Sequence, residues 1–299
     1  MFQGCTSLTQ CPDLRKITNL TGYCSCMSMF QGCTSLTQAI LPSRVLLNGS
    51  SMRRMFFGCT SITSTTECKV LQLAIDSMGE MFANCSNLET SLVKIENPAY
   101  SSSSYYNAQY SFYVFNTETK EVTAKKEYSG YGQGPFSFMY YNCTSLTSVP
   151  PMKSYYSVGQ RNMPSNAIVS DLFIFNQMFI NCTSLREISI IFTEANINRS
   201  YFGYSYLITG DNEKISISYG CTALDTLSIV INSSKNPVLR TDKYLYFFDP
   251  VDTLTLGNIN QYCSVVLEDM DDNMTIVVKD NTNNITGIPD TATIEYILN

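Results

Sequence analysis

The amino-acid sequence predicts an α/β solenoid, in which coils of one repeated unit stack and their strands form a parallel β-sheet. Three observations support this fold class. A short motif recurs seven times, its cysteine is regularly spaced, and segments with alternating apolar residues follow several copies. Internal repetition at a fixed period is the feature that most directly identifies such architectures.

The repeated motif reads Met-Phe-x-Gly/Asn-Cys-Thr-Ser-Leu. Its copies begin at Met1, Met29, Met55, Met81, Met139, Met178 and, in a decayed form, Ile217. Successive motif cysteines from Cys5 to Cys85 lie 28, 26 and 26 positions apart, and those from Cys85 to Cys221 lie 58, 39 and 39 positions apart. A period in the middle twenties fits a leucine-rich-repeat-like coil of one strand and a short helix. The longer gaps indicate one coil plus an inserted segment.

Each motif position has a physical interpretation. Gly and Asn alternate before the cysteine, and these residue types share a tolerance of positive φ. We therefore expect a left-handed residue there that ends a short helix on the side opposite the sheet. The segments 185–190 and 224–229 alternate apolar and polar residues, which predicts strands with one buried face. The segments after each motif, from 33–38 to 221–230, should occupy equivalent places in consecutive coils.

The chain has 12 cysteines, of which one per coil falls at the same phase of the repeat. Because free cysteine packs as a small buried hydrophobe, we expect a ladder of reduced, buried thiols. Zinc is disfavoured, since no Cys-x₂-Cys pair is present. A disulfide at Cys24 or Cys26 stays an open alternative.

The repeats divide the chain into two segments. Residues 1–235 are predicted to form the solenoid, with insertions at about 93–138, 151–175 and 191–216. Residues 236–299 read as degenerate, strand-rich repeats or a cap, because solenoids close with atypical repeats. Strands are expected there at 252–256, 274–278 and 291–297. Since Met1 belongs to the first copy, the sequence also fits a segment of a longer protein.

Composition excludes several classes of function. The chain contains no His, which excludes Ser-His-Asp and Cys-His catalysis and imidazole metal ligands. The net charge is −6 and no Lys/Arg-rich stretch is present, so a nucleic-acid partner is not expected. The sequence contains no apolar run of about 18 residues, so a membrane span is not predicted. No cofactor is expected, and the oligomeric state is not predicted.

The motif resembles the repeats of the BspA-like leucine-rich-repeat family, which is known from surface proteins of gut and oral bacteria and some parasitic protists. The resemblance covers roughly residues 1–231. It implies a non-catalytic adhesion protein, at the cell surface or secreted, that binds a surface protein or glycan. Similar repeats in gut bacteriophage proteins make a virion-associated tail-fibre or receptor-binding component the first alternative. The family supplies no catalytic residues.

The Tyr-rich insertions are the predicted binding site, because Tyr offers a large contact area and a hydroxyl group at low entropic cost. Within the first insertion, residues 111–122 predict two short strands around a polar turn. The candidate partner-binding residues are Tyr105, Tyr106, Tyr110, Tyr113, Tyr131, Tyr201 and Tyr204. The alternative is that these residues only pack the insertions onto the solenoid.

Three further alternatives follow from the sequence. A carbohydrate-active enzyme needs only two carboxylates, so the absence of His does not exclude it. A structural spacer is a second alternative. The acidic run 269–273 could hold Ca²⁺ through oxygen ligands, although a solvated turn is the simpler interpretation.

Overall fold

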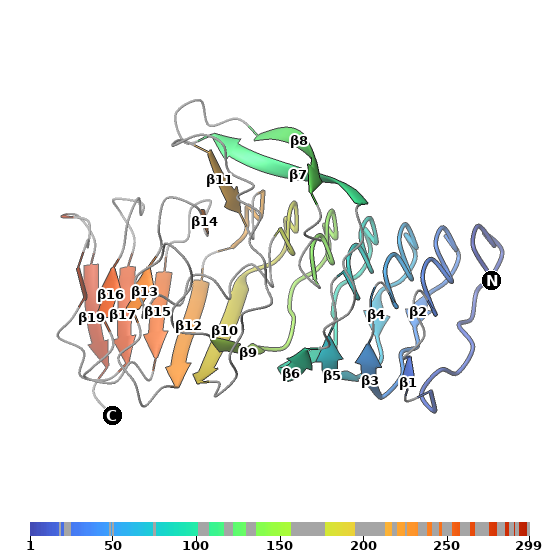
Figure 1. Ribbon diagram of the computed structural model, residues 1–299, viewed down its shortest axis with the longest axis horizontal. Helices are drawn as coiled ribbons and strands as arrows, with labels where there is room; N and C mark the ends of the chain where they lie inside the picture. The colour runs from blue at the N-terminus through green and yellow to red at the C-terminus, as the bar shows by residue number, and fades with distance from the viewer. Residues whose placement is uncertain are drawn as a thin grey trace.

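The computed structural model of the chain describes residues 1–17, 19–20, 25–47, 49, 51–73, 76–100, 108–116, 122–129, 136–156, 177–194, 213–216, 220–224, 226–232, 238–240, 245–246, 253–257, 264–266, 275–279, 285–286, 290 and 293–297. The described strands are arranged along one long axis, with β1 and β19 toward opposite ends (Figure 1).

The largest element is a ten-stranded sheet in which every neighbouring pair of strands is parallel. Its strands in spatial order are β1 (Asn19–Leu20), β3 (Arg44–Leu47), β5 (Cys68–Leu73), β6 (Val93–Tyr100), β9 (Met152–Tyr156), β10 (Glu187–Glu194), β12 (Thr226–Asn232), β15 (Thr253–Gly257), β17 (Thr275–Lys279) and β19 (Thr293–Ile297). The spatial order follows the chain, so each new strand adds beside the last. The predicted parallel sheet is therefore confirmed, and so are the three strands expected in the C-terminal segment.

Three smaller sheets accompany it. The first pairs β2 (Gln38–Ala39) with β4 (Ser64–Thr65), and parallel bridges at Thr90 and Ser148 continue this ladder. The second contains β13 (Val238–Arg240), β16 (Ser264–Val266) and β18 (Ile285–Thr286). The third contains β14 (Leu245–Tyr246), β11 (Glu213–Ser216), β7 (Ala108–Asn116) and β8 (Val122–Ser129). In the early coils, the residues directly after the motif thus form only the short β2–β4 ladder, and the main strands begin later than predicted.

The predicted short helices are wrong for the residues that the structure describes, where no helix occurs. The Met-Phe segments form tight turns instead. In an α-helix each amide would donate within its own segment. Here the amides of Phe30 and Gly32 donate to Met55 and Phe57 of the next repeat, with N–O distances of 2.8 Å. The Cys33 amide closes the turn by donating to Phe30 O at 3.1 Å.

The Gly/Asn position is left-handed, as predicted. Asn84, Asn142 and Asn181 have φ of 62°, 57° and 58°, and the motif glycines have φ of 69–76°. A second left-handed residue lies four positions earlier in five coils. These residues are Ser28, Arg54, Glu80, Phe138 and Gln177, with φ of 52–57°. Two left-handed residues so close together interrupt any helix between them, which is the physical reason for the turns.

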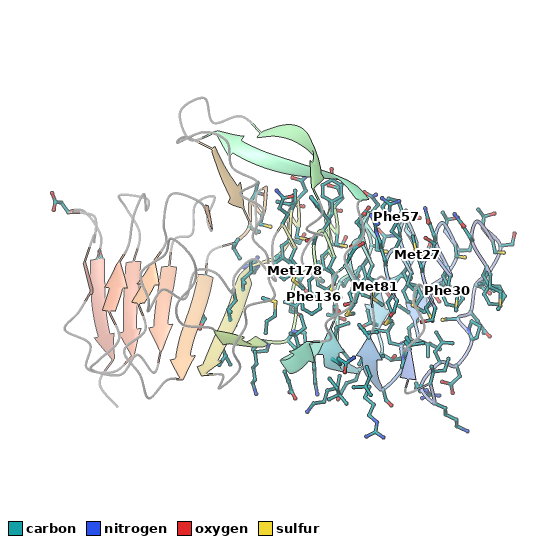
Figure 2. All side chains as sticks on the ribbon, viewed as in Figure 1. Met27, Phe30, Phe57, Met81, Phe136 and Met178 are labelled. Carbon is teal, nitrogen blue, oxygen red and sulfur yellow. The ribbon has the colours of Figure 1, made fainter. Side chains whose placement is uncertain are left out.

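The aromatic residue of the motif forms a continuous column through the stacked repeats. Adjacent rings lie 5.2–5.7 Å apart between centroids, with interplanar angles of 2–11°. The column contains Phe2, Phe30, Phe56, Phe82, Tyr140 and Phe179. Side chains fill the space around it (Figure 2). Met52, Met78 and Phe136, each three positions before a motif Met, are also fully buried. The repeat therefore begins earlier than the eight-residue motif suggests.

We predict that Gly58→Val destabilises the protein by about 1–2 kcal/mol, the cost of a left-handed β-branched residue. Gly58 has φ of 69° and a Cβ there would meet nothing within 4 Å, so backbone strain alone is expected. Gly58→Asn is the matched control, because Asn84 fills the equivalent position. Urea denaturation of both variants checks this. Equal stability of the two variants would contradict the assignment.

Candidate binding surface

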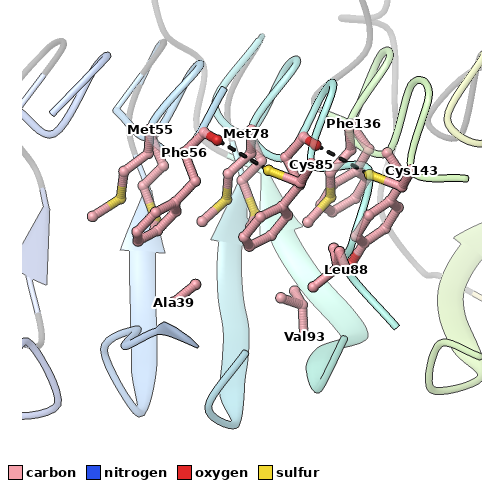
Figure 3. Close-up of a cluster of buried hydrophobic side chains, with 14 of the residues drawn as sticks. Ala39, Met55, Phe56, Met78, Cys85, Leu88, Val93, Phe136 and Cys143 are labelled. Atoms are coloured by element: carbon pink, nitrogen blue, oxygen red, sulfur yellow. Dashed lines mark hydrogen bonds between the residues drawn. The ribbon is translucent and has the colours of Figure 1, made fainter. Parts of the chain in front are cut away.

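The motif cysteines form the predicted ladder of buried thiols. Cys33, Cys59, Cys85, Cys143 and Cys182 are fully buried, and the described cysteines are free. These five thiols and that of Cys221 each donate a hydrogen bond to the carbonyl of an aromatic motif residue in the preceding repeat, with S–O distances of 2.8–3.1 Å. Two of these bonds are drawn in Figure 3. The thiols therefore hold repeats together and are not available to a partner.

Burial also suppresses thiol reactivity, because the thiolate is the reactive form. Burial raises the pKa of Cys59 and Cys68 to about 12, from an ordinary value of 9.0. It raises the pKa of Cys85 and Cys182 well above 9.0. These groups stay protonated at neutral pH and do not fit nucleophilic catalysis.

An ion cluster links two neighbouring coils and was not expected from the sequence. Arg54 forms a bidentate pair with Glu80, with N–O distances of 2.8–3.0 Å. Arg53 contacts Glu80 at 2.8 Å and Asp76 at 3.2 Å. Burial opposes ionisation of Glu80, but the two guanidinium groups hold its pKa below the ordinary value. The sequence feature that could have predicted this cluster is the opposite charge of Arg54 and Glu80, which lie one repeat period apart.

The described residues contain no group of three or more Cys, Asp or Glu side chains that could hold a metal ion. The acidic run 269–273 lies outside those residues. No helix in the described part of the chain is long and apolar enough to cross a membrane.

The insertions leave and re-enter the repeats without interrupting their stacking. The Phe82 amide donates to Met139 O at 2.9 Å across the first insertion. The margins of the predicted insertions belong to the main sheet, however. Residues 93–100 form β6 and residues 152–156 form β9. The reason is that each coil still needs its strand to continue the parallel ladder.

The first and third insertions meet in one four-stranded sheet. β7 and β8 form an antiparallel hairpin from Ala108↔Ser129 to Phe115↔Val122. The first strand predicted within 111–122 is confirmed, but the second begins at Val122, where the predicted segment ended. β11, from the third insertion, pairs with the other edge of β7, and β14 pairs with β11. Figure 1 shows β7 and β8 beyond the turn side of the repeats, on the side opposite β3, β5 and β6. We call this four-stranded unit the insertion sheet.

Two of the candidate tyrosines lie in the insertion sheet. Tyr110 and Tyr113 are on β7, where they pair with Glu127 and Ala124 of β8. Positions three apart on a strand belong to opposite faces, so one partner contacting one face would meet only one of the two. The other candidates lie outside the described residues: Tyr105, Tyr106, Tyr131, Tyr201 and Tyr204.

We predict that the free energy of unfolding falls as pH rises above about 9, less steeply in Cys59→Ser than in the wild type. The folded pKa of Cys59 is raised, so its contribution is complete below pH 9.0 and is lost as pH rises toward about 12. Plotted against pH, the free energies of unfolding of the wild type and of Cys59→Ser should differ in slope by up to about 1.4 kcal/mol per pH unit.

Thiol labelling of the native protein provides the accompanying control. Exposed Cys5 should react, whereas Cys59 should react only after unfolding. Identical pH slopes together with rapid labelling of Cys59 would contradict the buried ladder.

Compared with protein-family models, curated proteins and solved structures, the chain matches none in any of the three comparisons. The family resemblance of the motif therefore stays a prediction.

Proposed function

We propose that the chain is a non-catalytic binding protein of the BspA-like leucine-rich-repeat type. In this proposal its coils form a solenoid that works at a cell surface or in secreted form and presents the insertions to a surface protein or glycan. The observation that carries the proposal is the insertion sheet, in which two insertions distant in sequence meet away from the β3–β5–β6 part of the main sheet.

The periodic positions support this division of roles. The motif aromatics, cysteines and leucines are almost entirely buried from the second to the sixth copy. Large-to-small changes at such positions typically cost 2–5 kcal/mol, so these residues cannot readily vary to suit a partner. Insertions on a repeat scaffold lack this constraint and commonly form its binding face.

The described carboxylates favour binding over polysaccharide hydrolysis. A glycosidase needs two carboxyl groups that face a shared substrate. Among the described carboxylates, Asp13, Glu67, Asp76, Glu80 and Glu96 instead form ion pairs with Arg or Lys side chains. Exposed Glu89, Glu187 and Asp290 form no such pair within the described part of the chain. A carboxylate held by a cation is a poor general acid, because the pair favours the ionised form.

We predict that replacing residues 101–134 by a short linker abolishes partner binding and preserves folding, since β6 ends at Tyr100 and buried Phe136 is retained. A screen against glycans and extracellular proteins identifies the partner with the intact chain. Shortening residues 157–175 provides a matched control. Equal binding by the linker variant would assign the site elsewhere, and release of sugar products would favour the enzyme alternative.

We predict that Tyr110→Ala and Tyr113→Ala affect binding unequally. A buried Tyr at the centre of an interface contributes about 2 kcal/mol, roughly thirtyfold in affinity. Only the tyrosine on the contacting face should show such a loss, and titration calorimetry with the identified partner measures it. Losses of equal size would indicate that the strand is enclosed by its partner or that the hairpin is misfolded, which circular dichroism distinguishes.

A further inference from the structure

Basic residues occupy aligned positions on three consecutive strands of the main sheet. Arg44 on β3 pairs in register with Lys69 on β5, which pairs with Lys94 on β6. On the next strand, Lys153 of β9 pairs with Glu96 of β6. We call Arg44, Lys69, Lys94 and Lys153 the basic row.

The basic row lies on the outer face of the sheet. Arg44 and Lys69 are exposed and Lys94 and Lys153 are partly exposed, whereas the adjacent Val45, Val70 and Ile95 are buried. Strands in a sheet lie about 4.8 Å apart. Arg44, Lys69 and Lys94 therefore present cations at short, regular intervals along the stacking axis, and Lys153 is offset by two residues on the next strand.

The row is not neutralised by its surroundings. Lys94 pairs with Glu67 at 2.9 Å, and Lys69 pairs with Glu96. Arg44 and Lys153 form no ion pair with any carboxylate that the structure describes. Four cations thus stand against two carboxylates, on a chain whose net charge is −6.

Folding does not require this arrangement. Like charges directly opposite one another on neighbouring strands are destabilising, and any polar residue would suit an exposed position. The repulsion among Arg44, Lys69 and Lys94 is offset in part by the pairs Lys69–Glu96 and Lys94–Glu67. An external anion would relieve this repulsion.

We propose that the basic row binds a linear acidic glycan, carrying sulfate or carboxylate groups, along the stacking axis of the sheet. Evenly spaced cations suit a linear polymer with repeated charges. Glu67 and Glu96 beside the row can accept hydrogen bonds from sugar hydroxyl groups. This surface is separate from the insertion sheet and adds a second binding surface to the proposed function without depending on the insertions.

The same residues disfavour a nucleic acid. Duplex DNA carries one negative charge per about 1.7 Å of its axis, so Glu67 and Glu96 beside the row would repel it more strongly than a glycan with fewer charges along its length. Proteins that bind single strands stack bases on aromatic side chains. The half-buried residues beside the row on β3 and β5 are Leu46, Leu71 and Gln72, none of which carries an aromatic ring.

The test measures binding of heparin and polygalacturonate oligosaccharides to the whole chain at low ionic strength. Combining Arg44→Gln, Lys69→Gln and Lys94→Gln should weaken binding about tenfold or more and reduce its salt dependence. The matched control combines Arg186→Gln, Arg240→Gln and Lys279→Gln, which removes the same charge from positions off the strands β3, β5, β6 and β9. It should change affinity less than about twofold if attraction is local.

A second variant is expected to change oligosaccharide affinity in the opposite direction. Glu67→Gln with Glu96→Gln should tighten binding about threefold or more, a gain that misfolding could not produce. Binding of either oligosaccharide supports the proposal, and the two probes separate sulfate from carboxylate recognition. No binding by the wild type, or equal loss in the control variant, would overturn it.

Two further outcomes assign the surface differently. Duplex DNA that binds as tightly through the same residues would make the row a nucleic-acid surface and overturn the glycan proposal. Loss of oligosaccharide binding on replacement of residues 101–134 would move the glycan site to the insertion sheet. That result would overturn this inference and leave the proposed function intact.

Discussion

Backbone hydrogen bonds between neighbouring repeats set the spacing that every other contact in the structure must match. The amides of Phe30 and Phe56 donate to Met55 and Met81 of the following repeat at 2.8 and 2.9 Å. The amides of Gln31 and Cys33 instead donate to Ser28 and Phe30 and close tight turns within the repeat. Successive amides thus alternate between bonds to the next repeat and bonds within their own repeat. Once coils are held at this spacing, a ring at the same phase of each coil stacks on its neighbour. The thiol of each motif cysteine likewise reaches the backbone carbonyl of the aromatic residue in the preceding repeat.

The same constraint explains why long insertions are tolerated. The bond from Phe82 to Met139 has the same length as the bond from Phe56 to Met81, although the chain between the first pair is far longer. An insertion needs only to begin and end at adjacent coils. The entropic cost of a longer closed loop grows slowly with its length. Variable segments can therefore be added without weakening the ladder of hydrogen bonds beneath them.

Sequence reasoning succeeded where a residue type reports directly on backbone conformation or burial. Gly and Asn at one position predicted positive φ because few other residues tolerate it, and buried Cys followed from its periodic placement. The helices were predicted wrongly because the second left-handed position has no such restriction. Ser28, Arg54, Glu80 and Phe138 share no chemistry that marks this conformation. Local pattern predicted the first hairpin strand but placed the second too early, since β8 begins at Val122. The pairing of β11 with β7 depends on non-periodic segments whose register no local pattern determines.

Charges placed at the repeat period have two different consequences in this structure. Arg54 and Glu80 carry opposite signs one repeat apart, and stacking turns them into a bidentate pair that joins two coils. Arg44, Lys69 and Lys94 carry the same sign at intervals of 25 residues, and stacking brings them into repulsion. Neither set forms a run of charges in the linear sequence, because each coil contributes only one residue to a row that stacking creates. The first arrangement stabilises the fold, so the fold itself accounts for it. The second is offset only in part, by the pairs Lys69–Glu96 and Lys94–Glu67, and the acidic glycan proposed above would supply further negative charge along the same axis.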